Sequence, residues 1–214
     1  MNYILTWITA NWIETIGALL TLLFLYLQVT RNWTMWIVGI LSGIFYVYLN
    51  FKVQLYALAG LCTYNVLVSI YGIYCWKFAK TKDKKELPFR FIDRKLTLRL
   101  IGISIVVFAF IAFILLKFTD IPNPLLNTGD LFSFVLDNLI TTLSIIGAWM
   151  AAKKIVESWL VWIFVDPCNT ALYLYKGMIP SMILYLIYSI FAIFGYFQWR
   201  KAAKSQNDTA HTTV

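Results

Sequence analysis

The sequence contains only one histidine, His211, and that residue lies in the polar C-terminal tail. The three cysteines, Cys62, Cys75 and Cys168, lie inside apolar blocks, without the paired or clustered spacing typical of disulfides and metal sites. Glycine-rich phosphate-binding loops are also missing. The apolar region therefore offers no Ser/His or Cys/His pair and no histidine-based zinc site. We expect no catalytic residue, no metal, no cofactor and no enzymatic activity.

Charged residues are scarce as well. They make up 13% of the 214 residues, about half of the share that a soluble domain carries. The hydrophobic residues, 61% of the chain, come in long blocks, and several blocks reach the roughly 20 residues that cross a bilayer. The pattern predicts an all-α integral membrane protein with seven spans, at about 12–29, 33–50, 55–76, 99–116, 132–152, 159–175 and 178–199.

Lysine and arginine residues are distributed unequally between the two sides of this bundle. Fifteen of the eighteen follow the first, third, fifth and seventh spans, and the other side carries only Lys52, Lys117 and Lys176. Cytoplasmic loops of membrane proteins carry such an excess, so the N-terminus is expected outside and the C-terminus in the cytoplasm. The net charge of +8 is explained by this topology, and we expect the lipid bilayer, not nucleic acid, as its partner.

The first three predicted spans resemble the last three when the sequence is shifted by 123 residues. The final match, 71–77 with 194–200, shares the order aromatic, Gly, any residue, aromatic, any residue, Trp, basic. Several matches at one offset favour an internal repeat over a shared ending of unrelated membrane helices. The other matched residues are Glu14 with Asp137, Thr21 with Ser144, Arg31 with Lys154 and Trp36 with Trp159.

The repeat predicts two parallel three-helix units joined by one linking helix, a 3+1+3 arrangement. An axis along the membrane normal would relate the units, and a substrate site would lie between them near the midplane. This symmetry favours a carrier over a receptor or an enzyme. The expected parts are a first repeat at 12–76, a basic connection and linker helix at 77–131, a second repeat at 132–200 and a disordered polar tail at 201–214.

Asp166 is the ionisable residue placed deepest in a predicted span. An isolated charge near the bilayer centre costs roughly 2.5–3.5 kcal/mol on insertion scales, so such a residue lines a cavity or has a partner. Trp159, Trp162, Asn169 and Tyr173 share its helix face at steps of three and four residues. This face suits a flat, partly polar cation, because indoles stack on rings and a carboxylate meets positive charge. The alternative is an ion pair that joins helices, but no lysine or arginine lies at comparable depth.

Other polar residues inside the spans are secondary candidates for the same site. In the fifth span, Asp137 and Thr141 share a face with Asn138 beside them, although Asp137 could equally be solvated or cap a helix. In the second span, Gly39 and Gly43 indicate helix packing more than ligand contact. The remaining candidates are Tyr46 and Asn50 on that span and one or more of Thr63, Tyr64 and Asn65 on the third.

Four short motifs resemble the PnuC family of vitamin transporters. They are ESWLVWI at 157–163 with a polar residue at 166, LSI at 143–145, QLYA at 54–57, and Tyr71-Gly72-x-Tyr74-x-Trp76. Their order and spacing extend the resemblance over about 12–200. The resemblance implies an enlarged SWEET-type fold, a homotrimer, and a place in the bacterial cytoplasmic (inner) membrane.

The same resemblance implies facilitated diffusion of an unphosphorylated vitamin precursor, which a separate cytoplasmic kinase would trap. Nicotinamide riboside is the usual substrate of the family, and thiamine and riboflavin are taken up by relatives. By position, Trp159, Trp162 and residue 166 would contact the substrate. Nicotinamide riboside members carry asparagine where this chain has Asp166, and a carboxylate favours a cationic ligand. Nicotinamide riboside and thiamine both carry a cationic ring, so the departure leaves the choice between them open. We expect nicotinamide riboside because it is the usual substrate of the family, with thiamine as the close alternative; an ion-coupled transporter of another cation is the rival class.

Overall fold

A computed structural model describes residues 12–52, 56–80, 86–118, 128–175 and 179–212. Within these residues the chain forms seven α-helices and no named strand, which confirms the all-α prediction. Helices satisfy every backbone hydrogen bond internally, and the long apolar blocks of this sequence therefore fold this way in lipid. The helices are α2 (Trp12–Val29), α3 (Met35–Lys52), α4 (Tyr56–Ile73), α5 (Arg94–Phe118), α6 (Thr128–Ala152), α7 (Ser158–Tyr175) and α8 (Ile179–Thr212), and a π-helical turn, η1 (Tyr74–Phe78), follows α4.

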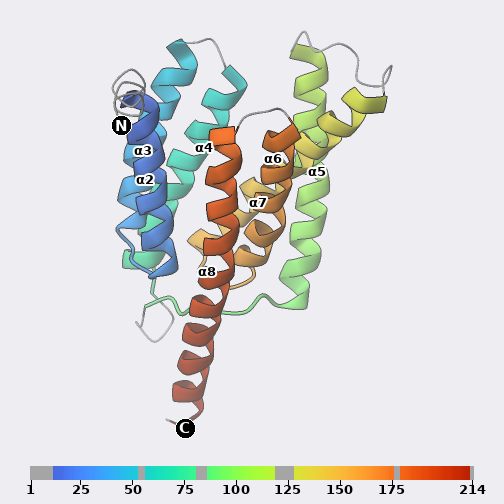
Figure 1. Ribbon diagram of the computed structural model, residues 1–214. Helices are drawn as coiled ribbons and strands as arrows, with labels where there is room; N and C mark the ends of the chain where they lie inside the picture. The colour runs from blue at the N-terminus through green and yellow to red at the C-terminus, as the bar shows by residue number, and fades with distance from the viewer. Residues whose placement is uncertain (1–11, 53–55, 81–85, 119–127, 176–178, 213–214) are drawn as a thin grey trace.

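The helices stand side by side in one bundle, with α2 and α3 at one edge and α5 at the other (Figure 1). Helix α3 packs on α4 as α7 packs on α8, and α2 packs on α3 as α6 packs on α7. These pairs form two groups, α2–α4 and α6–α8. The groups meet where α2 contacts α8 and where α4 contacts α6. Helix α5 packs on α6 and turns large side chains such as Val106 and Phe110 outward.

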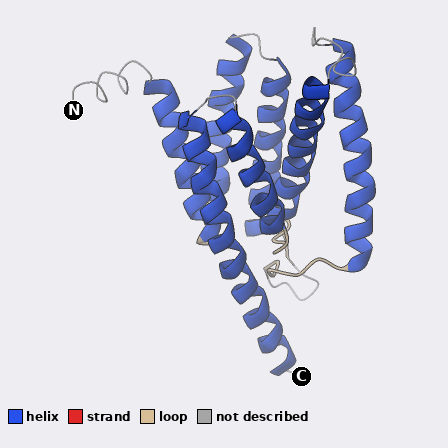
Figure 2. Cartoon of the chain, turned by 45° about the vertical axis from the view of Figure 1, so that its right-hand side comes forward, coloured by secondary structure: helices blue, strands red, loops and turns tan. Residues whose placement is uncertain are grey.

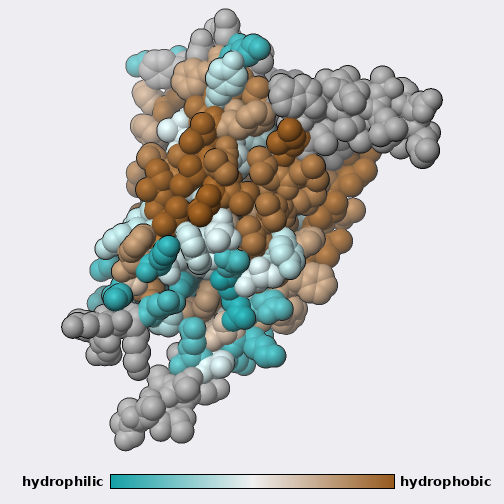
Figure 3. All heavy atoms as spheres, turned by 90° about the vertical axis from the view of Figure 1, so that its left-hand side faces the viewer, coloured by the Kyte–Doolittle hydropathy of each residue, from teal (hydrophilic) through white to brown (hydrophobic). Residues whose placement is uncertain are grey.

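An apolar band covers the face shown in Figure 3, and hydrophilic residues gather below it, at the end of the bundle nearest the C-terminus. In the described part of the chain, three helical segments are long and apolar enough by themselves to cross a membrane: Arg94–Lys117, Phe134–Ala152 and Met182–Gln206. The hydrophilic end is where α2, α4 and α6 finish, and it carries basic residues such as Lys153 and Arg200. We call it the basic end.

The polar tail is expected to be disordered from residue 201 onward, but α8 continues as a helix to Thr212 (Figure 2). Ala202 and Ala203 are buried in the main hydrophobic cluster. Gln206 accepts a hydrogen bond from the backbone of Phe89, with 2.8 Å between Phe89 N and Gln206 Oε1. The extension is thus held by contacts with a distant part of the chain, which the composition of the tail does not reveal.

Several contacts recur at the spacing of 123 residues. A Cβ added at Gly72 would overlap the indole of Trp36, and one added at Gly195 would overlap the indole of Trp159. Only glycine lets these two indoles lie so close to the facing helix. Arg31 and Lys154, which follow α2 and α6, both have positive φ, at 61° and 56°. That conformation ends a helix with an αL residue at each point.

Two tryptophan hydrogen bonds cross between the groups at the basic end. Trp76 Nε1 donates to the carbonyl of Ala151 at 3.3 Å, and Trp199 Nε1 donates to the carbonyl of Gln28 at 2.9 Å. Trp199 follows Trp76 by 123 residues, and Ala151 follows Gln28 by the same number. Each group therefore supplies a donor to the last turn of a helix in the other, which ties the two together at this end.

Candidate functional site

Asp166 lies in the middle of α7 and is only 5% exposed. Asn169, one turn further on, is also buried. Pro167 lacks an N–H group, so the backbone carbonyl one turn earlier has no helical donor. This carbonyl is a further polar group near Asp166. In the described part of the chain, Asp166 forms no ion pair with a basic side chain. A carboxylate buried in this way leaves its charge for a ligand to meet.

Two tyrosines of α8 face Asp166. Tyr185 and Tyr188 both lie close enough to interact electrostatically with its carboxylate. The rings of Tyr173 and Tyr185 stack, with centroids 5.2 Å apart and planes 14° from parallel, and their side chains share a hydrogen bond. The result is a carboxylate bordered by phenol groups, two of them already arranged as a flat stack.

The same cluster reaches the other group of helices through Tyr188. Its side chain hydrogen-bonds with Thr21 of α2 and lies near Tyr46 of α3. The Tyr46 hydroxyl occupies the space that a Cβ at Gly17 would need. We call Asp166, Tyr173, Tyr185, Tyr188 and Tyr46 the tyrosine cluster; it joins α3, α7 and α8 and touches α2.

Trp162 lies one turn before Asp166 and is partly buried. Its indole packs near Gly147 of α6, where an added Cβ would lie 3.5 Å from the ring. Its Nε1–H is buried and has no hydrogen-bond partner. An unpaired buried donor is uncommon, and here it offers one hydrogen bond to a bound molecule.

Trp159 lies elsewhere, although it shares the helix face with Asp166. It is 0% exposed, packed on Gly195, and its ring meets that of Trp199 edge to face at 5.4 Å. Seven residues of helix, about 10 Å, separate it from Asp166. Its place is in the aromatic core at the basic end.

Two of the candidates on α6, Asn138 and Thr141, make hydrogen bonds away from the tyrosine cluster. Asn138 is buried and donates from Nδ2 to the Phe108 carbonyl of α5 at 3.0 Å. Its Oδ1 has no partner. Thr141 donates to the carbonyl of Asp137 in its own helix, and Asp137 is partly buried. Of these three residues, Asn138 therefore faces α5.

On α4, the three adjacent polar residues point in different directions. Thr63 and Asn65 are exposed, and Thr63 donates to the carbonyl of Ala59 in its own helix. Tyr64 points inward and donates to the carbonyl of Ile145 at 2.7 Å. Asn50 lies on α3, and its side chain lies outside the described residues.

A family model described as "Nicotinamide mononucleotide transporter" matches residues 11–201. The chain belongs to this family. The resemblance seen in the motifs is therefore confirmed, and the chain is a multi-pass membrane protein of a transporter family. Members of such a family are named as transporters, which agrees with the expectation that the chain is not an enzyme.

The chain is similar to two curated relatives and one solved structure. It is 24% identical over 216 residues to the nicotinamide riboside transporter PnuC of Escherichia coli (strain K12), covering 94% of this chain and 90% of that protein. The nicotinamide riboside transporter PnuC of Shigella flexneri matches with the same values. The crystal structure of the vitamin B3 transporter PnuC matches with a TM-score of 0.70 and 19% identity, covering 94% of this chain and 86% of that one. The all-α fold is thus that of a known transporter.

Proposed function

We propose that this protein takes up a flat, positively charged vitamin precursor, and that nicotinamide riboside is its substrate. The observation that carries the proposal is a buried Asp166 without a basic partner, bordered by tyrosine rings. A pyridinium ring stacks on aromatic faces, and its charge is attracted by the carboxylate. The names of the relatives in Escherichia coli and Shigella flexneri support the same substrate.

In this proposal the substrate contacts Asp166, the tyrosines around it, and Trp162. The indole N–H of Trp162, which has no partner, donates to an oxygen or amide of the substrate. Asn169 is buried beside Asp166 and supplies a neutral polar group. Asn138 is bonded to α5, and we assign no direct substrate contact to it or to its neighbours Asp137 and Thr141.

The architecture that we propose for transport is two three-helix repeats, α2–α4 and α6–α8, linked by α5. The recurring packing of glycine on tryptophan and the reciprocal tryptophan hydrogen bonds at one offset support it. The basic end is the cytoplasmic end, since lysine and arginine are concentrated there. The N-terminus is then outside and the C-terminus inside a bacterial cytoplasmic membrane.

Transport in this proposal is facilitated diffusion: the two repeats open to each side in turn around a fixed site. A cytoplasmic kinase phosphorylates the substrate and so makes net uptake one-way. The chain assembles as a homotrimer, as the family motifs imply. Thiamine is the second candidate substrate, because Asp166 replaces the asparagine of nicotinamide riboside members and its charge suits a thiazolium equally well.

The first test is to titrate the purified protein with nicotinamide riboside and with thiamine, following tryptophan fluorescence and calorimetric heat. We expect saturable binding of nicotinamide riboside that quenches tryptophan fluorescence, because a pyridinium ring beside Trp162 accepts an electron from the excited indole. Tight binding of thiamine alone would make thiamine the substrate in place of nicotinamide riboside, and the proposed binding site would stand. Binding of neither compound would contradict the proposed function.

A further inference from the structure

Phe89 belongs to a loop, yet it is only 7% exposed. Its ring meets that of Trp76 at 5.5 Å and that of Trp199 at 5.0 Å, both near edge to face. The two tryptophan rings are themselves 5.6 Å apart. One loop side chain therefore fills the junction between η1, which follows α4, and the middle of α8. A buried aromatic of this kind holds its loop in place by the surface it removes from water.

The loop backbone is fastened at Phe89 and at residues that follow it. Its own N–H donates to Gln206 on the extension of α8. Arg90 N–H donates to the carbonyl of Lys154 at 3.1 Å, and its carbonyl accepts from Val156 N–H at 3.0 Å. Ile92 N–H donates to the Glu157 carboxylate at 2.9 Å. Residues 86–93, which we call the clasp, thus connect α8 with the turn between α6 and α7 (Figure 2).

The clasp closes over the place where the two proposed repeats hold each other. Trp76 and Trp199 donate their indole N–H groups to carbonyls of the opposite repeat. Phe89 packs against both rings at once. For the repeats to separate at the basic end, both tryptophans must leave those carbonyls, and Phe89 must leave the junction.

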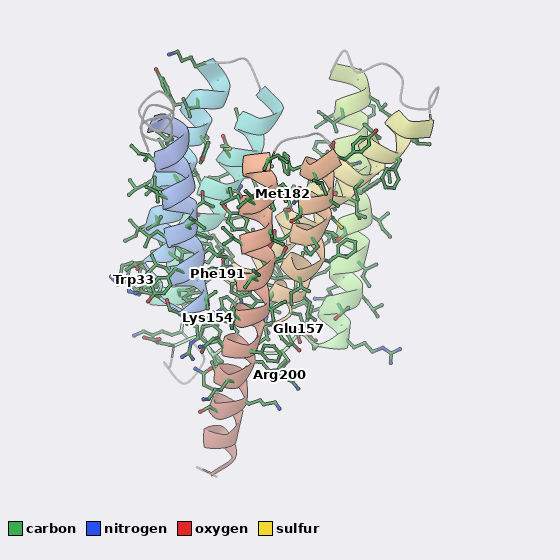
Figure 4. All side chains as sticks on the ribbon, viewed as in Figure 1. Trp33, Lys154, Glu157, Met182, Phe191 and Arg200 are labelled. Atoms are coloured by element: carbon green, nitrogen blue, oxygen red, sulfur yellow. The ribbon has the colours of Figure 1, made fainter. Side chains whose placement is uncertain are left out.

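Lys154 adds a charge to this junction. Its side chain is buried, with Nζ 5.0 Å from the Trp76 ring centre and 5.3 Å from that of Phe89 (Figure 4). Burial lowers the pKa of Lys154, and Glu86 at the start of the clasp partly opposes that shift. The ammonium is covered while Phe89 is in place, and water reaches it when the clasp lifts. Desolvation of this charge therefore favours opening, whereas the cation–π contacts favour closure.

We propose that residues 86–93 are a clasp that keeps the cytoplasmic end shut, and that substrate leaves toward the cytoplasm only when Phe89 is withdrawn from between Trp76 and Trp199. The inference rests on the proposed function for its direction of transport. The closed junction itself is independent of the substrate. In the described structure, the clasp is seated and the basic end is held together.

Cys75 is a native reporter of this movement. It is buried beside Trp76 in the same hydrophobic cluster and close enough to Lys154 to interact electrostatically. In a protein with Cys62→Ser and Cys168→Ser, a maleimide reacts with Cys75 only as fast as the junction opens. The labelling rate without substrate therefore measures clasp opening directly.

The test compares the Cys75 labelling rate in Phe89→Ala, Gln206→Ala and Phe91→Ala on that background. Phe89→Ala should label at least tenfold faster, because it removes the ring that fills the junction. Gln206→Ala should give a smaller increase; its side chain is exposed, so its loss leaves the fold intact. Phe91→Ala is the matched control, since Phe91 lies two residues away and is 38% exposed. It should label at the parent rate.

Equal rates in all four proteins, or equal increases for Phe89→Ala and Phe91→Ala, would overturn the clasp. Binding of nicotinamide riboside and thiamine is measured on the same preparations. Faster labelling of Phe89→Ala without binding of either compound would support the proposed clasp and contradict the proposed substrates. Binding of a compound together with a labelling rate that Phe89→Ala does not change would support the proposed function and contradict the clasp. The two proposals can therefore fail separately.

Discussion

Replacing Asp166 with asparagine is expected to weaken thiamine binding at least tenfold, about 1.4 kcal/mol. The substitution preserves the shape of the side chain and removes only its charge. In a buried site without a basic partner, that charge has little solvent screening and acts mainly on the ligand. Nicotinamide riboside should lose less affinity, because the resemblance to its transporters implies that an asparagine at this position also binds it. Calorimetric titration of both ligands against both proteins checks the expected order.

Asp137→Asn is the matched control for this experiment. It makes the same chemical change in a partly buried residue of α6, about as far along its helix as Asp166 is along α7. The affinities for both ligands should stay within about twofold of the parent values, the size of an indirect effect of a fraction of a kcal/mol. Equal affinities of the Asp166→Asn protein and its parent would refute the electrostatic role of Asp166.

Replacing Trp162 with alanine should weaken nicotinamide riboside binding roughly a hundredfold, since both a ring contact and a hydrogen bond are lost. Trp162→Phe retains an aromatic face but has no N–H, so it should lose only about tenfold, the size of one hydrogen bond. This series separates stacking from donation. It is measured by calorimetry on protein whose monodispersity and thermal unfolding have been checked.

Trp159→Ala provides the contrast. Trp159 is fully buried on Gly195 and Trp199, and truncation of such a residue removes about 3–5 kcal/mol of stability. Its main effect should be a lower unfolding temperature. Trp162→Ala should lower that temperature much less. An unchanged affinity in Trp162→Ala would remove this residue from the site, and a binding loss in Trp159→Ala without destabilisation would bring Trp159 into it.

The positions of the helices could be predicted closely because charged and polar residues interrupt the apolar blocks. Helix α2 begins and ends as expected, at 12 and 29, and α7 differs by one residue at its start. The helical extension of α8 could not be predicted, because it depends on Ala202 and Ala203 packing in the core and on Gln206 binding the clasp. The polar composition of this tail by itself predicts disorder.

The candidate site could be predicted only in part. Helical periodicity correctly places Asp166 and Asn169 on one buried face. It does not say how far that face extends before a different neighbour takes over, and Trp159 meets the aromatic core instead. Tyr185 and Tyr188 were missed, since their spacing of three residues acquires meaning only once α8 is known to pack on α7.

Polarity inside a span was a weaker guide than burial. Thr63 is polar and exposed, at little cost, since its hydroxyl donates to a carbonyl of its own helix. Its neighbour Tyr64 points inward. From the sequence, the clasp is predicted only as part of a basic connection that sets the orientation of the chain in the membrane. The apolar residue Phe89 within it indicates a further role, because its side chain is buried.

The central claim is that a buried carboxylate among tyrosines selects a cationic ring for passive uptake. It is tested most directly by the entry of labelled nicotinamide riboside, and of its neutral reduced form, into proteoliposomes prepared without any ion gradient. The two compounds share the ribose and the amide, and they differ in the charge and the aromaticity of the ring. We predict that nicotinamide riboside equilibrates across the membrane at a rate at least tenfold above that of the reduced form. Equal rates for the two forms, or no entry of nicotinamide riboside without a gradient, would contradict the claim.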